Sequence, residues 1–491
     1  MSPQKSVTKT KPRQVKYLII GNSAAGVAAV ESIRQYDKTG SLAVVSDEPW
    51  HTYSRPLISY LLEGKTTQEK MRYRGDSFYE RYAVDTYLGV RAEKLDTKKR
   101  IVRLSDGVVL KYEKLLLATG SVPFVPPISG CPAPNTGKGV YTFIKLADAL
   151  ALQETVTAST QVVVIGGGLT GVKATEGLLH LTKNISLVEL APRILPNALD
   201  TAASDIVKRR LESAGVTINC DASVSEVLTG ADGNVSSVRL SDGRTIPCDV
   251  LVISIGVRPN VELTKETDVA VERGILIDET CQTSVPDVFA AGDCVVSHDL
   301  TDDSKRILAI LPNAYQQGKT AGAVMAGQDR TDKGARPINA TSFIGLPLIT
   351  AGKTSLTAEQ AAEQGITIII DSDRVDSKME LRVASCELRE ESKRPTGADF
   401  GNRASARTGS PATGVVDSEG ENYRKLVIQN DRIIGFILLG AEYTKRAGIL
   451  TDLLNRQVPL SSVGAGVLQT PELLLFDKAE RLQRMEGVRS I

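Results

Sequence analysis

The residues best suited to carry chemistry are three glycines in the middle of the chain. Gly166, Gly168 and Gly171 have the spacing GxGxxG directly after the apolar run 162–165. Glycine at the first position allows a sharp turn, and glycine at the last lets a helix pack closely on the strand before it. The N–H groups of the first helical turn would then point at an anion, which the helix dipole favours. Strand, glycines and helix together predict a binding turn for the pyrophosphate of a dinucleotide.

An acid lies at the distance that such a turn requires. Glu189 ends the next apolar run, 23 residues after Gly166. A carboxylate there binds the ribose 2′-hydroxyl and repels a 2′-phosphate, so we expect NADH to be preferred over NADPH. Arg193 lies close in the sequence and weakens that preference.

A second, less complete copy lies near the N-terminus. The run 17–20 predicts a buried parallel strand, and Gly21, Ser23 and Gly26 follow it before an apolar pattern of helical spacing over 24–36. Serine stands where the fingerprint has its middle glycine. An ordinary strand–turn–helix would also explain this copy, so the case for a second dinucleotide site depends on the complete copy.

Candidate partners for this first turn come next along the chain. A strand over 41–45 ends in Ser46, Asp47 and Glu48. Asp47, 26 residues after Gly21, is the acid that we expect to bind a ribose, and Glu48 is the alternative. Arg55 and Pro56 then precede an apolar helix, where the guanidinium could contact a phosphate or a flavin edge. A surface arginine at a helix start is the alternative.

The two glycine turns are followed by similar arrangements. Residues 79–113 alternate in the manner of small antiparallel strands, and a buried strand over 115–118 ends in Thr119 and Gly120. After the second turn, a hairpin and a strand lead to Gly256. A short strand over 288–291 ends in Gly292 and Asp293, and a helix begins near Asn313. Two copies of one plan imply two dinucleotide sites.

Composition restricts the class of protein. With 491 residues, we expect two to four domains. The net charge of +1 indicates no nucleic-acid partner, and no apolar run is long enough to span a membrane. The six scattered cysteines and three histidines predict neither a disulfide framework nor a metal site, and they fit a cytoplasmic protein. Difficult chemistry would therefore require an organic cofactor.

The termini and the C-terminal third differ from the rest. The basic segment 1–14 has no apolar core and predicts a disordered lead-in, not a secretory signal. From about residue 337 the pattern changes to mixed α+β, with helices near 442–456 and 471–486. The polar, Gly/Ser-rich segment 387–421 predicts a long loop.

The ordered series GNSAAG, LLLATGSVP, GGGLTG, GVRPN and VFAAGD resembles the FAD- and NAD(P)-dependent pyridine nucleotide oxidoreductases. The resemblance implies an α/β protein with two Rossmann-like domains, each a three-layer parallel sheet with small antiparallel inserts, and a C-terminal α+β interface domain. It divides the chain into an FAD domain (15–120 and 264–335), an NAD domain (121–263) and an interface domain (336–491) that usually makes a homodimer.

The motifs and the resemblance together nominate the binding residues. Those for FAD are Gly21, Asn22, Ser23, Ala24, Ala25, Gly26, Asp47, Glu48, Arg55, Pro56, Val90, Ala118, Thr119, Gly120, Gly292, Asp293, Asn313 and Ala314. Those for NAD are Gly166, Gly168, Leu169, Thr170, Gly171, Glu189 and Gly256.

The branch of the family depends on the electron acceptor. The CxxxxC pair of disulfide reductases is absent, and HTYSRPLISYLLEGK lacks the single cysteine of NADH oxidases, peroxidases and coenzyme A disulfide reductases. YSRPLIS instead resembles rubredoxin and ferredoxin reductases and the flavin module of NADH-nitrite reductases, in which the basic residue before the proline contacts FAD. The resemblance implies electron transfer from NADH through FAD to an iron–sulfur protein or partner subunit. An oxidase or reductase of oxygen or a quinone, and a slow flavin-bound NADH sensor, are the alternatives.

One position departs from the family pattern. The family commonly has Glu two residues after the last glycine of the second turn, and this chain has Lys173. A reversed charge near the nicotinamide could alter hydride geometry. A lysine that extends to the surface is the alternative.

Overall fold

The computed structural model describes residues 12–372, 421–445 and 447–462. The chain divides into two compact units, the first ending at Asn339 and the second beginning at Ala340. The predicted helix over 471–486 and the predicted loop over 387–421, except for residue 421, lie outside the described residues.

The first sheet is built around the N-terminal apolar run. In the described residues it has seven strands in the order β3-β2-β1-β6-β5-β4, and β17 pairs with β6. β1 begins at Arg13, inside the segment predicted as a lead-in. Its strands are β1 (Arg13–Ile20), β2 (Leu42–Ser46), β3 (Val84–Leu88), β4 (Ala92–Asp96), β5 (Ile101–Leu104), β6 (Val109–Leu117) and β17 (Val288–Ala290).

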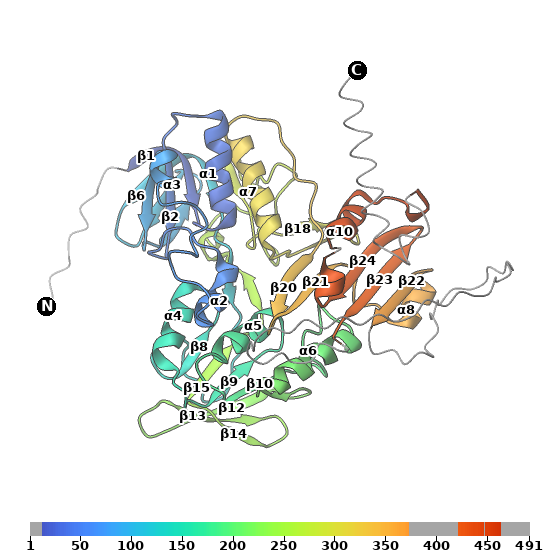
Figure 1. Cartoon of the computed structure of the whole chain (residues 1–491). Helices are drawn as coiled ribbons and strands as arrows, with labels where there is room; N and C mark the ends of the chain where they lie inside the picture. Colours follow the sequence, from blue (N-terminus) through green and yellow to red (C-terminus); the bar gives the residue numbers. More distant parts are fainter. Residues whose placement is uncertain (1–11, 373–420, 446, 463–491) are drawn as a thin grey trace, which may run out of the picture. The chain divides into compact units, whose positions relative to one another are not determined.

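Both faces of β1 are buried, as its apolar run predicts. Tyr17 and Ile19 pack under two helices, α1 (Ala24–Tyr36) and α7 (Leu311–Met325), which lie side by side (Figure 1). Leu18 and Ile20 pack on the opposite face with apolar residues of β5 and β6. Burying each such side chain contributes about 1.5–3 kcal/mol, so this strand fixes the position of the turn that follows it.

The prediction of small antiparallel strands over 79–113 is wrong for the first of them. β3 runs parallel to β2, with Val84 opposite Leu42. The chain between β2 and β3 includes two short helices, α2 (Ile58–Leu62) and α3 (Phe78–Arg81). This crossover brings the chain back to the end of the sheet at which β2 began, so that β3 can run in the same direction. β4, β5 and β6 do pair antiparallel, which confirms the rest of the prediction.

A second parallel sheet follows the complete glycine motif. Its five strands have the order β11-β10-β9-β15-β8 among the described residues. They are β8 (Val140–Thr142), β9 (Val162–Ile165), β10 (Ile185–Val188), β11 (Thr217–Asn219) and β15 (Val250–Ile253), with helices α4 (Leu146–Thr155), α5 (Leu169–Leu178) and α6 (Thr201–Ser213). An antiparallel sheet, β12 (Val224–Thr229), β13 (Val235–Leu240) and β14 (Thr245–Pro247), packs apolar side chains against one face.

Two short strands connect these parts of the first unit. β7 (Ser121–Pro123) and β16 (Val257–Pro259) pair antiparallel, directly after the Gly120 turn and the Gly256 turn. A further hairpin, β18 (Ser297–Asp299) and β19 (Ser304–Arg306), precedes α7. The chain therefore leaves the first sheet at β7 and returns at β16.

The second unit is mixed α+β, as expected. Its sheet has the order β20-β21-β24-β23-β22 and includes β20 (Ile338–Phe343), β21 (Leu346–Gly352), β22 (Thr367–Ser372), β23 (Tyr423–Gln429) and β24 (Arg432–Leu439). The α-helices of this unit in the described residues are α8 (Ala358–Glu363), α9 (Ala441–Thr444) and α10 (Ala447–Arg456), and a short 3₁₀ helix, Leu460–Ser462, follows α10.

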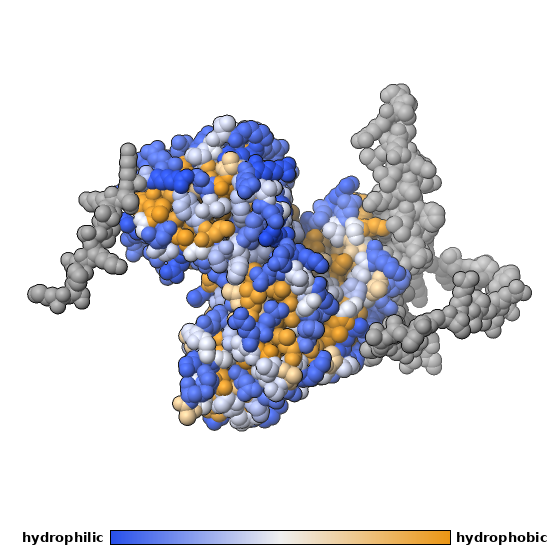
Figure 2. Space-filling view, turned by 60° about the vertical axis from the view of Figure 1, so that its left-hand side comes forward, coloured by the Kyte–Doolittle hydropathy of each residue, from blue (hydrophilic) through white to orange (hydrophobic). Residues whose placement is uncertain are grey.

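Polar side chains cover most of the face seen in Figure 2, with apolar patches between them. Within the ranges that the structure describes, no helix has both the length and the apolar character needed to cross a membrane.

Candidate dinucleotide sites

The first glycine turn has the predicted strand–turn–helix form. Gly21 has φ +126° and donates its N–H to the Val45 carbonyl at 2.8 Å. A Cβ on Gly26 would lie 2.1 Å from the Gly21 carbonyl oxygen, so the close packing of α1 requires glycine there. Ser23 is the N-cap with φ −112°, an extended conformation open to any residue. Serine at the middle position therefore does not distort this turn.

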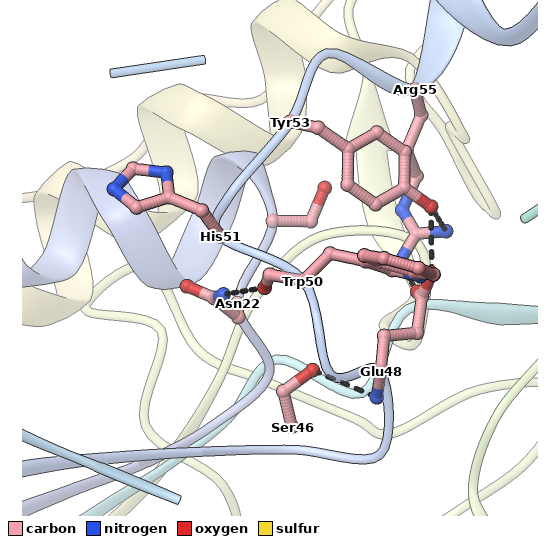
Figure 3. Close-up of a pocket in the computed structure, with 8 residues that line it drawn as sticks. Asn22, Ser46, Glu48, Trp50, His51, Tyr53 and Arg55 are labelled. Carbon is pink, nitrogen blue, oxygen red and sulfur yellow. Dashed lines mark hydrogen bonds and ion pairs between the residues drawn. The ribbon is translucent and has the colours of Figure 1, made fainter. Parts of the chain in front are cut away.

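A pocket lies between this turn and the end of β2 (Figure 3). Its lining combines residues of the turn, the acid-tipped strand and the segment after it: Asn22, Ser23, Ser46, Glu48, Trp50, His51, Tyr53 and Arg55. The structure thus brings together three of the predicted elements, which are separated in the sequence. Val90 lies beside them, because its N–H donates to the Ser46 carbonyl at 2.9 Å.

The two candidate acids after β2 have different surroundings. Glu48 is 7% exposed, accepts a hydrogen bond from Tyr53 at 2.7 Å and pairs with Arg55 at 2.5 Å. Asp47 has a half-exposed side chain that pairs with Lys145 at 2.8 Å, and it does not line the pocket. Only Glu48 belongs to the pocket wall.

Arg55 is part of this wall and not an isolated surface residue. Besides Glu48, its guanidinium donates to the Tyr53 hydroxyl at 3.2 Å. Burial raises the pKa of Tyr53 above its ordinary value, so the hydroxyl stays protonated and donates to Glu48. The Leu146 N–H donates to the same hydroxyl at 3.0 Å. The start of α4 therefore helps to hold the wall, and Pro56 follows in the short 3₁₀ helix Arg55–Leu57.

The sequence interpretation missed Trp50, His51 and Tyr53. Trp50 is the chain's single tryptophan and lies two residues after Glu48, and this position could have suggested that it lines the site. Trp50 Nε1 and His51 Nε2 are buried without a hydrogen-bond partner. Buried polar atoms are normally paired, so these two orphaned atoms fit a pocket whose polar ligand completes the hydrogen bonds.

The remaining predicted FAD residues lie at the ends of β6 and β17 and at the start of α7. Ala118 is beside the glycine turn, since a Cβ on Gly21 would lie 2.0 Å from its carbonyl oxygen. Thr119 Oγ1 donates to the Asn260 carbonyl at 2.6 Å, and the Asn260 N–H donates to the Gly120 carbonyl at 2.9 Å. These bonds hold the crossover to the second sheet.

Asp293 and Asn313 belong to two different networks. Asp293 accepts a hydrogen bond from Ser121 at 3.1 Å, and burial raises the pKa of its carboxyl. Asn313 is 2% exposed and donates to Ser297, while its Oδ1 has no partner. Gln317, which was not predicted, accepts from the Gly292 N–H at 2.9 Å. It lies one turn after Asn313 on α7, next to Ala314.

The second glycine turn is complete. Gly166 has φ +105°, and a Cβ on Gly171 would lie 1.8 Å from the Gly166 carbonyl oxygen. A Cβ on Gly168 would meet nothing within 4 Å, so protein packing does not explain the glycine at that position. Leu169 and Thr170 form the first turn of α5. The arrangement leaves room for a ligand close to the backbone of Gly168.

Glu189 is fixed beside this turn. Its carboxylate accepts from the Gly167 N–H at 2.6 Å and from the Ala191 N–H at 2.8 Å. Each carboxylate oxygen retains a free lone pair for a ligand hydroxyl. Arg193 donates to the Leu199 and Pro196 carbonyls at 3.4 and 3.3 Å. The guanidinium is thereby directed to its own loop.

Lys173 does not extend to the surface, and that alternative is wrong. Its side chain is 12% exposed and pairs with Glu176 at 2.5 Å. The α2 helix packs on this side of α5, and Lys173 Nζ lies 4.5 Å from the centre of the Tyr60 ring on α2.

The described cysteines are held as thiols. Burial raises the pKa of Cys248 to about 12, and burial also raises the pKa values of Cys281 and Cys294. No cysteine lines the pocket in the described part of the chain.

Comparison with known proteins gives a consistent result. The family model described as pyridine nucleotide-disulphide oxidoreductase matches residues 15–318. The epsilon subunit of an NADH-dependent phenylglyoxylate dehydrogenase from Aromatoleum evansii is 32% identical over 343 residues, which are 70% of this chain and 80% of the relative. Rubredoxin-NAD(+) reductase from Pseudomonas putida is 29% identical over 311 residues, which are 63% of this chain and 80% of the relative.

A solved structure resembles the whole fold. The covalent putidaredoxin reductase–putidaredoxin complex contains a chain that matches with a TM-score of 0.72 and 23% identity, covering 93% of this chain and 98% of that one. The family model extends over both glycine turns and over Asp293, Asn313 and Gln317. The chain therefore belongs to the pyridine nucleotide-disulphide oxidoreductase family and is a flavin-dependent NAD(P)H oxidoreductase.

Proposed function

We propose that this protein oxidises NADH with bound FAD and passes the electrons to an iron–sulfur protein of the rubredoxin or ferredoxin type, or to a partner subunit. When bound, FAD accepts a hydride from NADH and releases electrons to the acceptor. The observation that carries the proposal is the pair of strand–turn–helix units, each with an acid at the end of the next strand. The relative named rubredoxin-NAD(+) reductase supports the choice of acceptor.

The first turn and its pocket would hold FAD. The N–H groups at the start of α1 would bind the pyrophosphate, and Glu48 would accept ribose hydroxyls. Arg55 is pre-oriented by Glu48 and Tyr53, so its guanidinium loses little conformational freedom when it meets a phosphate. We also propose that the β6, β17 and α7 residues named above line the rest of this site.

The second turn and Glu189 would hold NADH. Because Gly167 and Ala191 fix the carboxylate, it can accept ribose hydroxyls without reorganisation, and it would repel a 2′-phosphate. NADH preference follows from that fixed charge.

We propose the domain division that the sequence predicts. FAD would be bound by 15–120 and 264–335 and NADH by 121–263, and 336–491 would be the interface of a homodimer. The pairing of β17 with β6 supports the discontinuous FAD domain. A cytoplasmic location fits the scattered cysteines.

Rapid mixing of the flavin-loaded protein with NADH or NADPH tests the proposal. We expect NADH to bleach the flavin absorbance quickly, NADPH to do so slowly, and Glu189→Gln to reduce the difference. Rubredoxin or ferredoxin should then be reduced much faster than oxygen. Fast oxygen consumption would favour an oxidase, and a slow bleach would favour an NADH sensor.

A further inference from the structure

A buried charge pair lies where the two nucleotide-binding parts of the first unit meet. Lys173 and Glu176 are 12% and 4% exposed, and Lys173 Nζ lies 2.5 Å from Glu176 Oε2. Both are on α5, the helix that begins at the second glycine turn. Burying an ammonium group is costly, and the adjacent carboxylate offsets that cost.

The same lysine also contacts the helix on the FAD side. Its Nζ lies 4.5 Å from the centre of the Tyr60 ring, within the range of a cation–π interaction. Tyr60 is on α2, three residues after the 3₁₀ helix that begins at Arg55. Figure 1 shows α2 beside α5. The two helices are close at Gly177, where a Cβ would lie 3.1 Å from side-chain atoms of Leu62. We call Tyr60, Lys173 and Glu176 the charge cluster.

The cluster joins two helical segments, one that begins at the second glycine turn and one that begins at Arg55 in the wall of the first pocket. Lys173 is two residues after Gly171, so its position is tied to the second turn. Tyr60 is five residues after Arg55, in consecutive helical segments, so its position is tied to the wall of the first pocket. A buried ion pair contributes little net stability, but removing one partner is disruptive. We therefore test whether the charge cluster aligns the second glycine turn with the first pocket, and not only whether it stabilises the fold.

We propose that Lys173 is a positioning residue for hydride transfer. Its ammonium, held by Glu176 over the Tyr60 ring, fixes the nicotinamide-binding turn relative to the flavin-binding pocket. The inference rests on the proposed function, because it concerns the alignment of the two cofactors. Misplacement by about 1 Å can slow such a reaction by about 100-fold.

Four variants separate alignment from stability. Lys173→Met keeps the length of the side chain and removes its charge, and Lys173→Arg keeps the charge. The double variant Lys173→Met/Glu176→Gln removes both charges of the pair, so neither of these two groups is left charged without the other. Lys208→Met is the matched control, because Lys208 pairs with Glu212 on α6 and both side chains are more than a third exposed.

Each variant is measured in two ways. Flavin-free and flavin-loaded protein are melted to obtain Tm. The loaded protein is mixed rapidly with increasing NADH, which gives the rate of flavin bleaching at saturation and the apparent Kd for NADH separately.

We expect Lys173→Met to retain FAD and to bleach at least about tenfold more slowly at saturating NADH, with little change in apparent Kd. Lys173→Arg should recover most of the rate. The double variant should recover Tm but not the rate, and Lys208→Met should match the wild type. The inference is overturned if Lys173→Met bleaches at the wild-type rate, or if the double variant recovers rate and Tm together. If the wild-type protein itself is not bleached by NADH, the proposed function has failed.

Discussion

Two substitutions in the second glycine turn should affect different properties, one the stability of the fold and the other the binding of NADH. Gly171 and Gly168 are the third and second glycines of the GxGxxG spacing, but the protein surrounds them differently. A Cβ on Gly171 would lie 1.8 Å from the Gly166 carbonyl oxygen, whereas a Cβ on Gly168 would meet no atom within 4 Å. Alanine should therefore reduce the stability of the fold at Gly171 and weaken the binding of NADH at Gly168.

The geometry sets the magnitude for Gly171→Ala. Real Cβ contacts are not found below 3.0 Å, so the helix must move away from the turn by at least 1.2 Å, which is 3.0 minus 1.8. Overpacking of a core typically costs about 1–3 kcal/mol, and a clash with backbone belongs at the upper end. We expect a loss of about 3 kcal/mol and a Tm lower by about 5–10 °C.

Gly168→Ala should leave the fold intact. Gly168 has φ −75° and ψ −178°, which alanine adopts without strain. Because alanine reduces the entropy of the unfolded chain, Tm should be unchanged or slightly higher. The added methyl group lies where the backbone must approach the pyrophosphate, so the Kd for NADH should rise at least about tenfold, a loss of about 1.4 kcal/mol.

The assay is a thermal melt of each variant together with a titration by NADH. A Gly171→Ala protein that melts at the wild-type temperature would refute the packing argument. A Gly168→Ala protein that binds NADH normally would refute the assignment of this turn to the cofactor.

Three further predictions follow from single groups. Trp50 is the chain's one tryptophan and lines the first pocket, so adding FAD to flavin-free protein should quench its fluorescence, and Trp50→Phe should abolish the signal. Hydrogen bonds, chiefly from Lys16, hold the pKa of Asp37 below its ordinary value of 3.8. Asp37 therefore stabilises the fold above that pH and loses this effect as the pH falls. Urea melts should show Asp37→Asn less stable than the wild type by about 1 kcal/mol at pH 7, and the difference should shrink as the pH falls from 4 to 2. Because burial raises the pKa values of Cys248, Cys281 and Cys294, iodoacetamide at pH 8 should leave all three unmodified in the native protein. Peptide mass spectrometry would contradict this if any of the three is alkylated before the protein unfolds.

Local features of the sequence determined the two glycine turns. The helix expected over 24–36 is α1, and the strand expected over 162–165 is β9. Both predictions succeed because a strand, a glycine turn and a helix start depend on residues within a few positions of each other. A turn that needs positive φ, as at Gly166, favours glycine for local steric reasons, so it can be recognised in the sequence without knowledge of distant contacts.

Only the tertiary structure decided which of the nominated side chains share a site. The spacing favoured Asp47 over Glu48, but Glu48 lines the pocket, because Asp47 pairs with Lys145 on a distant segment while Glu48 is held by Arg55 and Tyr53. The direction of β3 was mispredicted because alternation of apolar residues does not record which way a strand runs beside its neighbour. Lys173 is buried because α2 covers α5, a contact between helices more than 100 residues apart. Such pairings depend on the packing of the whole unit, and no local pattern in the sequence specifies them.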